Sequence, residues 1–446
     1  MLRVSVKQAR AGMVLAMPVF AAGDHWGAAQ DAALLNSGVE LDERTIDRLR
    51  EMGVGSVWVR YPSLEGLAKF ADEGVFRACA QVASALSTAL DPASARATAR
   101  LEFGAYKRAI GSLLRKLHKA PHAAVFLGQM NDARTPMARH AGNVCLLSVL
   151  MGLKLDFYLI RERPKVAAHT AMDVSNLGLA AMLHDAGILR LEDHVLERQR
   201  ARVDGPDEDD PDWREHVRLG YELLRGEIEP SAAAAVLQHH QRVDGSGYPQ
   251  TVPASATNPA RGMLGNEIHV FARIIAAADV FDRLRHGARA EIDAGPGELR
   301  VVRPAVAACK RMLEGAEAAG LDPIVVRGLI AAAPPFGPGT LVRLSDGREA
   351  AVCDWDLKDP CRPVVQIVPD LERGARALKT PRPERVDLRD RRDVTIIEAE
   401  GFDVRGELFA PKRLGEFDLD AMSRAAMNAA AESAVSPEIR AMLRAG

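Results

Sequence analysis

The sequence lacks features that mark several common protein classes. It contains no run of about 18 apolar residues, the length that a membrane-spanning helix needs, so no membrane span is expected. Its first 20 residues mix polar and apolar side chains and do not place a charged segment before an apolar one, which argues against a secretory leader. The net charge of −2 provides no basic surface for binding DNA or RNA. We therefore expect a cytoplasmic protein that does not bind nucleic acid polymers.

Cysteine is also scarce. The five cysteines are scattered and include no Cys-x-x-Cys pair: Cys79, Cys145, Cys309, Cys353 and Cys361. An odd, dispersed set favours reduced thiols over disulfides or a zinc knuckle. The remaining composition, 48% hydrophobic and 26% charged, is typical of a globular protein. The 446 residues exceed one ordinary core, so about two to four domains are expected.

Local patterns divide the chain into a helical centre with smaller flanking modules. Short β-like runs and one helical segment at 41–49 characterise the start of the chain, and a Pro/Gly breaker at 334–339 precedes a second series of β-like runs. The predicted fold class is therefore multidomain and mainly α. The expected divisions are a small α+β module at 1–62, a helical connector at 63–130, a helical domain at 131–332, a small β module at 333–410 and a helical tail at 411–446.

The most informative feature is a set of five histidines and two aspartates on segments with helical patterns. Its members are His140, His184, Asp185, His216, His239, His240 and Asp279. His140 shares an apolar helical stripe with Val144, Leu147 and Met151, so it should point inward. Asp279 lies in an almost wholly apolar segment, where an uncompensated carboxylate would cost several kcal/mol. Metal coordination would remove that cost.

The residue types of this set predict which metals it would bind. Neutral imidazole combined with carboxylate suits iron, manganese or zinc, whereas magnesium and calcium prefer oxygen ligands. Two metals sharing these ligands would be suited to hydrolysing a phosphodiester. Because adjacent residues on a helix point about 100° apart, His239 and His240 are expected to serve different metals. Any one of these histidines alone is more often a hydrogen-bonded core residue, so the prediction depends on the whole set. The acidic stretch 204–212 is expected to be a solvated loop, with a mobile flap near the site as the alternative.

A specific segment follows the histidine pair: Asp244-Gly245-Ser246-Gly247-Tyr248-Pro249. Together with AAMLHDAGI, WREHVRLGYELL and LGNEIHVFARIIAAADVFDRL, it resembles the HD-GYP domain, the bacterial branch of the HD phosphohydrolases that hydrolyses cyclic di-GMP. The resemblance extends from about His140 to Leu284, roughly a third of the chain. The first 60 residues and PPFGPGTLVRLSDGREAAV also resemble modules that flank such domains.

The resemblance implies an all-helical HD-type metal-binding domain in a bacterial signalling hydrolase. It assigns the seven residues as ligands of two divalent ions, iron or manganese first and zinc next. Asp185 would bridge the ions, with a water or hydroxide held between them, and would form the catalytic pair with His184. This phosphodiesterase would cut cyclic di-GMP to linear pGpG, GMP or both. The implied substrate-binding residues are Asp244, Gly247, Tyr248, Pro249 and Arg273. A diguanylate cyclase-type partner at the Gly-Tyr-Pro segment and a homodimer are further expectations.

The sequence departs from the family pattern at several positions. Ile188 stands where the family motif HDxGK has lysine, and Pro136 stands where members with a third metal have glutamate, which predicts two metals. After Asp282 the usual Leu-Thr-Ser-x-Arg-Pro-Tyr stretch is replaced, with Arg285 and Arg289 as candidate substitutes for its arginine. Two alternatives therefore stay open. One is a weak or inactive sensor or scaffold that binds nucleotide or a partner domain, and the other is a phosphohydrolase acting on another nucleotide.

Overall fold

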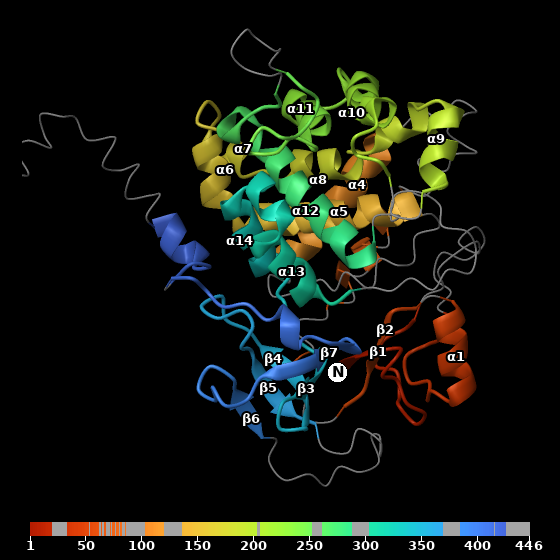
Figure 1. The fold of residues 1–446 in the computed structure, drawn as a ribbon. Helices are drawn as coiled ribbons and strands as arrows, with labels where there is room; N and C mark the ends of the chain where they lie inside the picture. The colour runs from red at the N-terminus through yellow and green to blue at the C-terminus, as the bar shows by residue number, and fades with distance from the viewer. Residues whose placement is uncertain are drawn as a thin grey trace, which may run out of the picture.

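The chain is mainly helical, with strands at both ends of the sequence, as the predicted fold class requires (Figure 1). The computed structural model describes residues 1–19, 34–52, 54–61, 103–119, 136–202, 206–251, 261–287, 303–368, 384–413 and 415–424, with isolated positions between 64 and 85. Much of the predicted connector and the tail beyond residue 424 lie outside the described residues. Among those residues no single helix is long and apolar enough to cross a membrane, although 137–154 and 156–162 pass that test as a pair bent by 86°.

Helix α12 (Val270–His286) runs through the helical body, and every residue from Val270 to Asp282 is buried. An apolar surface on all sides of a helix requires neighbours on all sides, and α12 packs against α5, α8, α11, α13 and α14. The bounds of the other helices in this body are α4 Phe103–Lys119, α5 Pro136–Lys154, α6 Asp156–Glu162, α7 Ala168–Ala171, α8 Ser175–Met182, α9 Asp193–Arg200, α10 Pro211–Leu224, α11 Pro230–Gln238, α13 Ala305–Glu314 and α14 Pro323–Ala332.

Three of these helices begin with an acidic residue followed by proline. Asp210 precedes α10, Glu229 precedes α11 and Asp322 precedes α14, and each carboxylate accepts hydrogen bonds from backbone N–H groups of the first turn. Proline at the first position loses no helical hydrogen bond, and the negative charge favours the N-terminal end of the helix dipole. These interactions fix the starts of α10 and α11. Helix α10 carries His216, and α11 ends just before His239 and His240.

The strands form two sheets. Near the start of the chain, β1 (Leu2–Ser5) pairs antiparallel with β2 (Ser56–Val59), Leu2 opposite Val59, and α1 (Glu43–Glu51) lies between them in sequence. The second sheet is antiparallel, in the order β6-β5-β4-β3-β7-β8. Its strands are β3 Leu341–Leu344, β4 Glu349–Asp354, β5 Val364–Ile367, β6 Arg385–Asp387, β7 Ile396–Ala399 and β8 Phe402–Asp403.

The two strand regions share one apolar core. Leu341, Ala351, Cys353 and Val368 of the second sheet are buried in the same cluster as the side chains of β1, β2 and α1. The backbone N–H of Arg3 donates to the carbonyl of Gly339 at 2.7 Å, beside a parallel bridge between Arg3 and Thr340. The two strand regions lie side by side beneath the helical body (Figure 1).

A cluster of three charged residues joins these sheets to α12. Glu400, in the turn between β7 and β8, lies 3.2 Å from both Arg3 and Arg285. Burial opposes ionisation of Glu400, but the two guanidinium groups hold its pKa below the ordinary value. The end of the central helix is therefore tied to the first strand of the chain through one carboxylate.

Candidate metal centre

Seven buried side chains from five segments converge inside the helical body. His140 comes from α5, His184 and Asp185 from the turn after α8, His216 from α10, His239 and His240 from the end of α11, and Asp279 from α12. Each of the seven is at most 1% exposed. Their ligand atoms fall into two groups, each with atoms within 4.8 Å of one another: His140, His184 and Asp279 in the first, and Asp185, His216, His239 and His240 in the second.

Asp185 lies between the two groups, with one carboxylate oxygen facing each. Its Oδ2 is 3.2 Å from Nε2 of His184 and 3.8 Å from Nε2 of His140. Its Oδ1 is 3.4 Å from Nε2 of His239 and 3.7 Å from Nε2 of His216. A carboxylate in this position has one oxygen available to each group.

Three of the imidazoles are oriented by their own chain. The Nδ1 atom of His184 lies 2.8 Å from the carbonyl oxygen of Ala181, that of His216 lies 2.7 Å from the carbonyl of Trp213, and that of His239 lies 2.6 Å from the carbonyl of Val236. A carbonyl oxygen can only accept a hydrogen bond, so each Nδ1 carries the proton and donates it. Each Nε2 therefore presents a lone pair towards Asp185, which is the arrangement of a metal-ligating histidine.

His140 is oriented by a carboxylate. Its Nδ1 donates to Oδ2 of Asp282 at 2.7 Å, while the amide of Asn143 donates to Oδ1 of the same carboxylate at 2.7 Å. Burial opposes ionisation of Asp282, but His286 and His140 hold its pKa well below the ordinary range. Sequence reasoning missed Asp282, although it lies one helical turn beyond Asp279 in the same apolar segment. Ligating histidines commonly donate their second N–H to such a carboxylate.

Glycine allows the turn that carries His184 and Asp185 to approach α10. A Cβ atom on Gly187 would stand 1.9 Å from the carbonyl oxygen of His216, which no side chain tolerates. Gly187 lies within a 3₁₀ helix, Ala186–Arg190, that packs against α10. Close backbone approach at this point brings His216 to the carboxylate of Asp185.

The residues fit a pair of cations. Within the described part of the chain, Nε2 of His184, His216 and His239 and both oxygens of Asp185 make no hydrogen bond of good geometry. Acceptors facing acceptors in a buried space are unfavourable unless a cation lies between them. Burial lowers the pKa of His216 to about 4, and it also lowers the pKa of His239. A buried imidazole that stays neutral keeps its Nε2 lone pair available for a cation.

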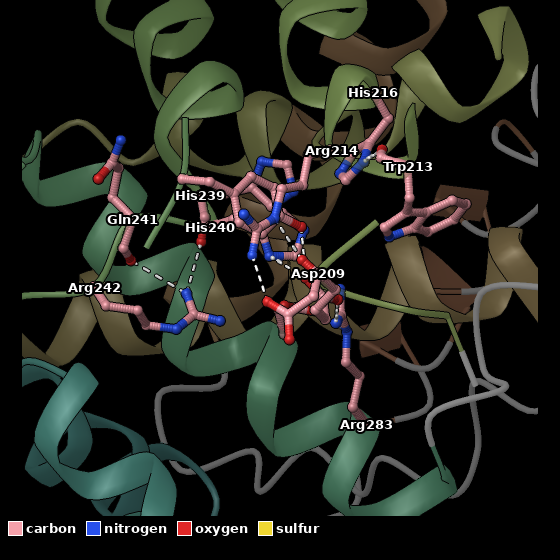
Figure 2. A network of polar contacts seen from close by, with 12 residues as sticks. Asp209, Trp213, Arg214, His216, His239, His240, Gln241, Arg242 and Arg283 are labelled. Atoms are coloured by element: carbon pink, nitrogen blue, oxygen red, sulfur yellow. Dashed lines mark hydrogen bonds and ion pairs between the residues drawn. The ribbon is translucent and has the colours of Figure 1, made fainter. Parts of the chain in front are cut away.

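The structure corrects the placement of the histidine pair. Helix α11 ends at Gln238, so His239 and His240 lie in the turn that follows it and not within the helix. Their ring centroids are 4.2 Å apart, and both belong to the group that contains Asp185 and His216. This grouping favours a shared ion over the two different metals expected from the helical spacing. Figure 2 shows the two rings close together beside His216.

The Gly-Tyr-Pro segment packs onto the histidine pair. A Cβ atom on Gly247 would lie 2.3 Å from the carbonyl oxygen of His240, so only glycine fits there. The ring of Tyr248 stacks on that of His240, with centroids 4.6 Å apart and planes at 16°. Pro249 follows through a cis peptide bond, and its carbonyl accepts from the side chain of Gln241 at 2.6 Å. Asp244 is exposed, and its carboxylate accepts from the N–H and hydroxyl of Ser246, which closes the turn.

Arg273 lies elsewhere. Its guanidinium donates to Tyr158 at 2.5 Å and to Asp322 at 2.8 Å, and it pairs with Glu162 at 2.5 Å. These three partners occupy it in the packing of α6 and α14 against α12, so the structure does not support the substrate-binding role expected for Arg273. Of the two other arginines considered from the sequence, Arg285 pairs with Glu400 and Arg289 lies outside the described residues.

Two charged residues at the site were not singled out by sequence reasoning. The carboxylate of Glu208 accepts a hydrogen bond from the hydroxyl of Tyr248 at 2.5 Å, lies 3.5 Å from Nδ1 of His240 and forms an ion pair with Arg283. The Nε atom of Arg283 lies 2.7 Å from Oδ1 of Asp279. Their spacing of four residues along one helix could have identified Arg283. Glu208 belongs to the acidic stretch 204–212, and its side chain contacts Tyr248 and Arg283 beside the site.

Comparison with known proteins gives independent information. Residues 164–296 match a family model described as HD domain. The chain is 39% identical over 117 residues to "Cyclic di-GMP phosphodiesterase response regulator RpfG" of Xanthomonas campestris, a match that covers 25% of this chain and only 27% of that protein. It is 24% identical over 400 residues to "Cyclic di-GMP phosphodiesterase PA4108" of Pseudomonas aeruginosa, which covers 82% of this chain and 84% of that one. It is also 29% identical over 163 residues to "3'3'-cGAMP-specific phosphodiesterase 3" of Vibrio cholerae, covering 35% and 29%.

Proposed function

We propose that this chain, an HD-GYP-type protein with an HD domain at residues 164–296, is a cyclic-dinucleotide phosphodiesterase that hydrolyses cyclic di-GMP. The observation that carries the proposal is the group of imidazole lone pairs that face the two oxygens of Asp185 in a buried space. Cations bound between these acceptors would stabilise the arrangement. The names of two relatives support cyclic di-GMP as the substrate.

The described residues would hold two divalent ions. His140, His184, Asp279 and one oxygen of Asp185 would hold the first ion, and His216, His239, His240 and the other oxygen of Asp185 would hold the second. Iron or manganese suits this ligand set, and so does zinc. Two bound ions would supply Lewis acidity for a phosphate oxygen and an activated water for attack on phosphorus.

The contribution of the chain itself is orientation and exclusion of water. Backbone carbonyls fix three imidazoles, Asp282 fixes the fourth, and burial keeps His216 and His239 neutral. The proposed products are linear pGpG, GMP or both. Ile188, the residue at the position of the family lysine, is 2% exposed and offers no proton to a leaving oxygen. That proton must therefore come from another group.

The buried Ile188 favours a second candidate, a sensor or scaffold that binds a nucleotide or partner domain without cutting it. A third relative named for 3'3'-cGAMP motivates a substrate panel that includes this dinucleotide. Contact with a diguanylate cyclase-type partner through the Gly-Tyr-Pro segment, a homodimer and a cytoplasmic location stay predictions. Since Gly247 and Tyr248 are buried, such a partner would meet the exposed Asp244 and Ser246.

The test is a hydrolysis assay joined to elemental analysis. The full chain, loaded anaerobically under reducing conditions with iron, manganese or zinc, is incubated with cyclic di-GMP and with 3'3'-cGAMP. We expect cleavage of cyclic di-GMP by the wild type and by Asp47→Asn, which changes an exposed aspartate on α1. Asp185→Ala should lose both metal and cleavage. Protein that binds metal and cyclic di-GMP but cleaves neither dinucleotide would reject hydrolysis and favour the sensor.

A further inference from the structure

The side chains around Glu208 form an anion-binding site beside the seven proposed metal ligands. We infer that Arg283 and Tyr248 bind the substrate phosphate, and that the carboxylate of Glu208 occupies that place when no phosphate is present. This inference rests on the proposed function because it concerns the same site. Arg283 would supply the positive charge for the phosphodiester that the family lysine, replaced here by Ile188, cannot supply.

Glu208 has the contacts of a bound anion. Its Oε2 accepts from the hydroxyl of Tyr248 at 2.5 Å and lies 3.5 Å from Nδ1 of His240, and its Oε1 pairs with Arg283. A guanidinium and a hydroxyl directed at two oxygens of one group recognise carboxylate and phosphate alike. The carboxylate lies beside a metal-ligand histidine, where the phosphate of a substrate has to approach.

Arg283 is held in place independently of Glu208. Its Nε lies 2.7 Å from Oδ1 of Asp279, one turn earlier on α12, and its Nη1 donates to Oε1 of Glu208. One guanidinium therefore connects a metal-ligand carboxylate to the anion at the mouth of the site. If Glu208 turns away, the contact with Asp279 keeps the guanidinium aimed at the vacated place. Arg283 can then exchange one anion for another without moving along the helix.

The neighbouring arginines serve other purposes. Arg214 donates through Nε to the backbone carbonyl of Glu208 at 2.5 Å and pairs with Asp209 at 2.7 Å. Arg242 donates to the backbone carbonyls of His239 and Gln241. Both are labelled in Figure 2 together with Arg283. Arg283 differs from them because it contacts the side chain of a metal-ligand residue and the side chain of Glu208.

Exchange requires a rotation of one side chain only. The backbone around Glu208 is anchored: the N–H of Asp207 donates to the side chain of Gln199 at 2.7 Å, and Arg198 pairs with Asp210 at 2.6 Å. The side chain of Glu208 is 39% exposed, so it has a route to solvent that the fully buried ligands lack. The carboxylate is therefore displaceable, whereas the segment that carries it is fixed.

Binding of inorganic phosphate to the metal-loaded full chain tests the inference without relying on catalysis. Glu208→Gln removes the competing charge, so the Kd for phosphate should fall about three- to tenfold by calorimetry. Arg283→Gln should raise that Kd about tenfold and should abolish the gain from Glu208→Gln in the double variant. Arg283→Lys keeps the charge but loses the planar fork, so a smaller rise is expected. Glu215→Gln and Arg218→Gln, on the exposed face of α10, are matched controls that should leave the Kd unchanged.

Metal content and circular dichroism accompany each titration. An unchanged or raised phosphate Kd in Glu208→Gln, or a loss of metal from that variant, would overturn the inference, because Glu208 would then be a structural residue or a ligand. If Arg283→Gln does not fold, Arg283→Lys replaces it in the test. A phosphate Kd that is unchanged in Arg283→Lys would then overturn the inference. The proposed function is tested separately from this inference. If the phosphate affinities respond as expected but the protein cleaves no dinucleotide, the proposed function is rejected and this inference stands.

Discussion

Asp282 and Asp279, one helical turn apart on α12, contact opposite nitrogens of the same imidazole. The carboxylate of Asp282 accepts from Nδ1 of His140 at 2.7 Å, and that of Asp279 lies 3.1 Å from its Nε2. The central helix thus contributes both a proposed metal ligand and the group that orients another. Because the ring is clamped between α5 and α12, packing of these two helices sets the position of His140.

Asp282→Asn should weaken metal binding about 10- to 100-fold, because the neutral amide no longer raises the basicity of His140. A competition titration with a chelating dye measures this affinity directly. Asp420→Asn, which changes an exposed aspartate near the end of the described chain, is the control. Equal affinities for Asp282→Asn and wild type would show that the carboxylate only fills space.

Gly247→Ala should displace the Gly-Tyr-Pro segment from the histidine pair, because the added Cβ would be 2.3 Å from the carbonyl of His240. Overpacking of this kind lowers the free energy of unfolding by about 1–3 kcal/mol. Urea unfolding provides the measurement. Gly406→Ala is a suitable comparison since nothing lies within 4 Å of its added Cβ. Equal loss in the two variants would contradict the packing described here.

Acidification should destabilise the metal-free protein between pH 6.5 and 4. At the start of α12, His269 accepts a hydrogen bond from the N–H of Phe271 through Nδ1, and burial together with Arg163 lowers its pKa to about 4. Since the folded pKa lies below the unfolded value, the unfolded chain binds the proton more readily in this window, and stability falls as the pH is lowered.

His269→Asn keeps an acceptor at the cap but cannot be protonated. The unfolding free energy of this variant should therefore depend less on pH than that of the wild type. Between pH 6.5 and 4 the two slopes should differ by up to about 1.4 kcal/mol per pH unit. Urea titrations at several pH values in chelator measure the slope. The exposed His194, replaced by asparagine, is the control. A slope identical to that of the wild type would disprove the role of His269.

Glu400→Gln should destabilise the junction between the sheets and the helical body. It leaves Arg3 and Arg285 buried without their shared carboxylate, which costs about 3–5 kcal/mol when a buried pair is broken. Limited proteolysis and urea unfolding both report this loss. Glu384→Gln breaks the exposed pair with Arg348, and it should change stability by less than about 1 kcal/mol.

The sequence predicted the interior position of the seven proposed metal ligands, because imidazoles and carboxylates on helical apolar faces have few alternatives to burial. His140 and Asp279 illustrate this point: both lie on helices, and their stripes determine where they point. That His239 and His240 serve different metals stays a prediction, which the grouping of both side chains with Asp185 and His216 disfavours. The partners of Arg273 could not be predicted, because Glu162 and Asp322 are distant from it in sequence. Glu208 lies in a segment without periodicity, so no pattern could place its side chain.

The shared core of the two strand regions has a consequence for biosynthesis. Leu2 and Val4 precede the helical body in the sequence, yet part of the apolar cluster they share, Leu341 and Ala351, leaves the ribosome only after that entire body. Non-local contacts of this kind form late, because the intervening chain must be ordered first. The nascent chain therefore exposes an incompletely covered apolar face while its central helices assemble. Chaperone demand should be greatest at that stage of synthesis.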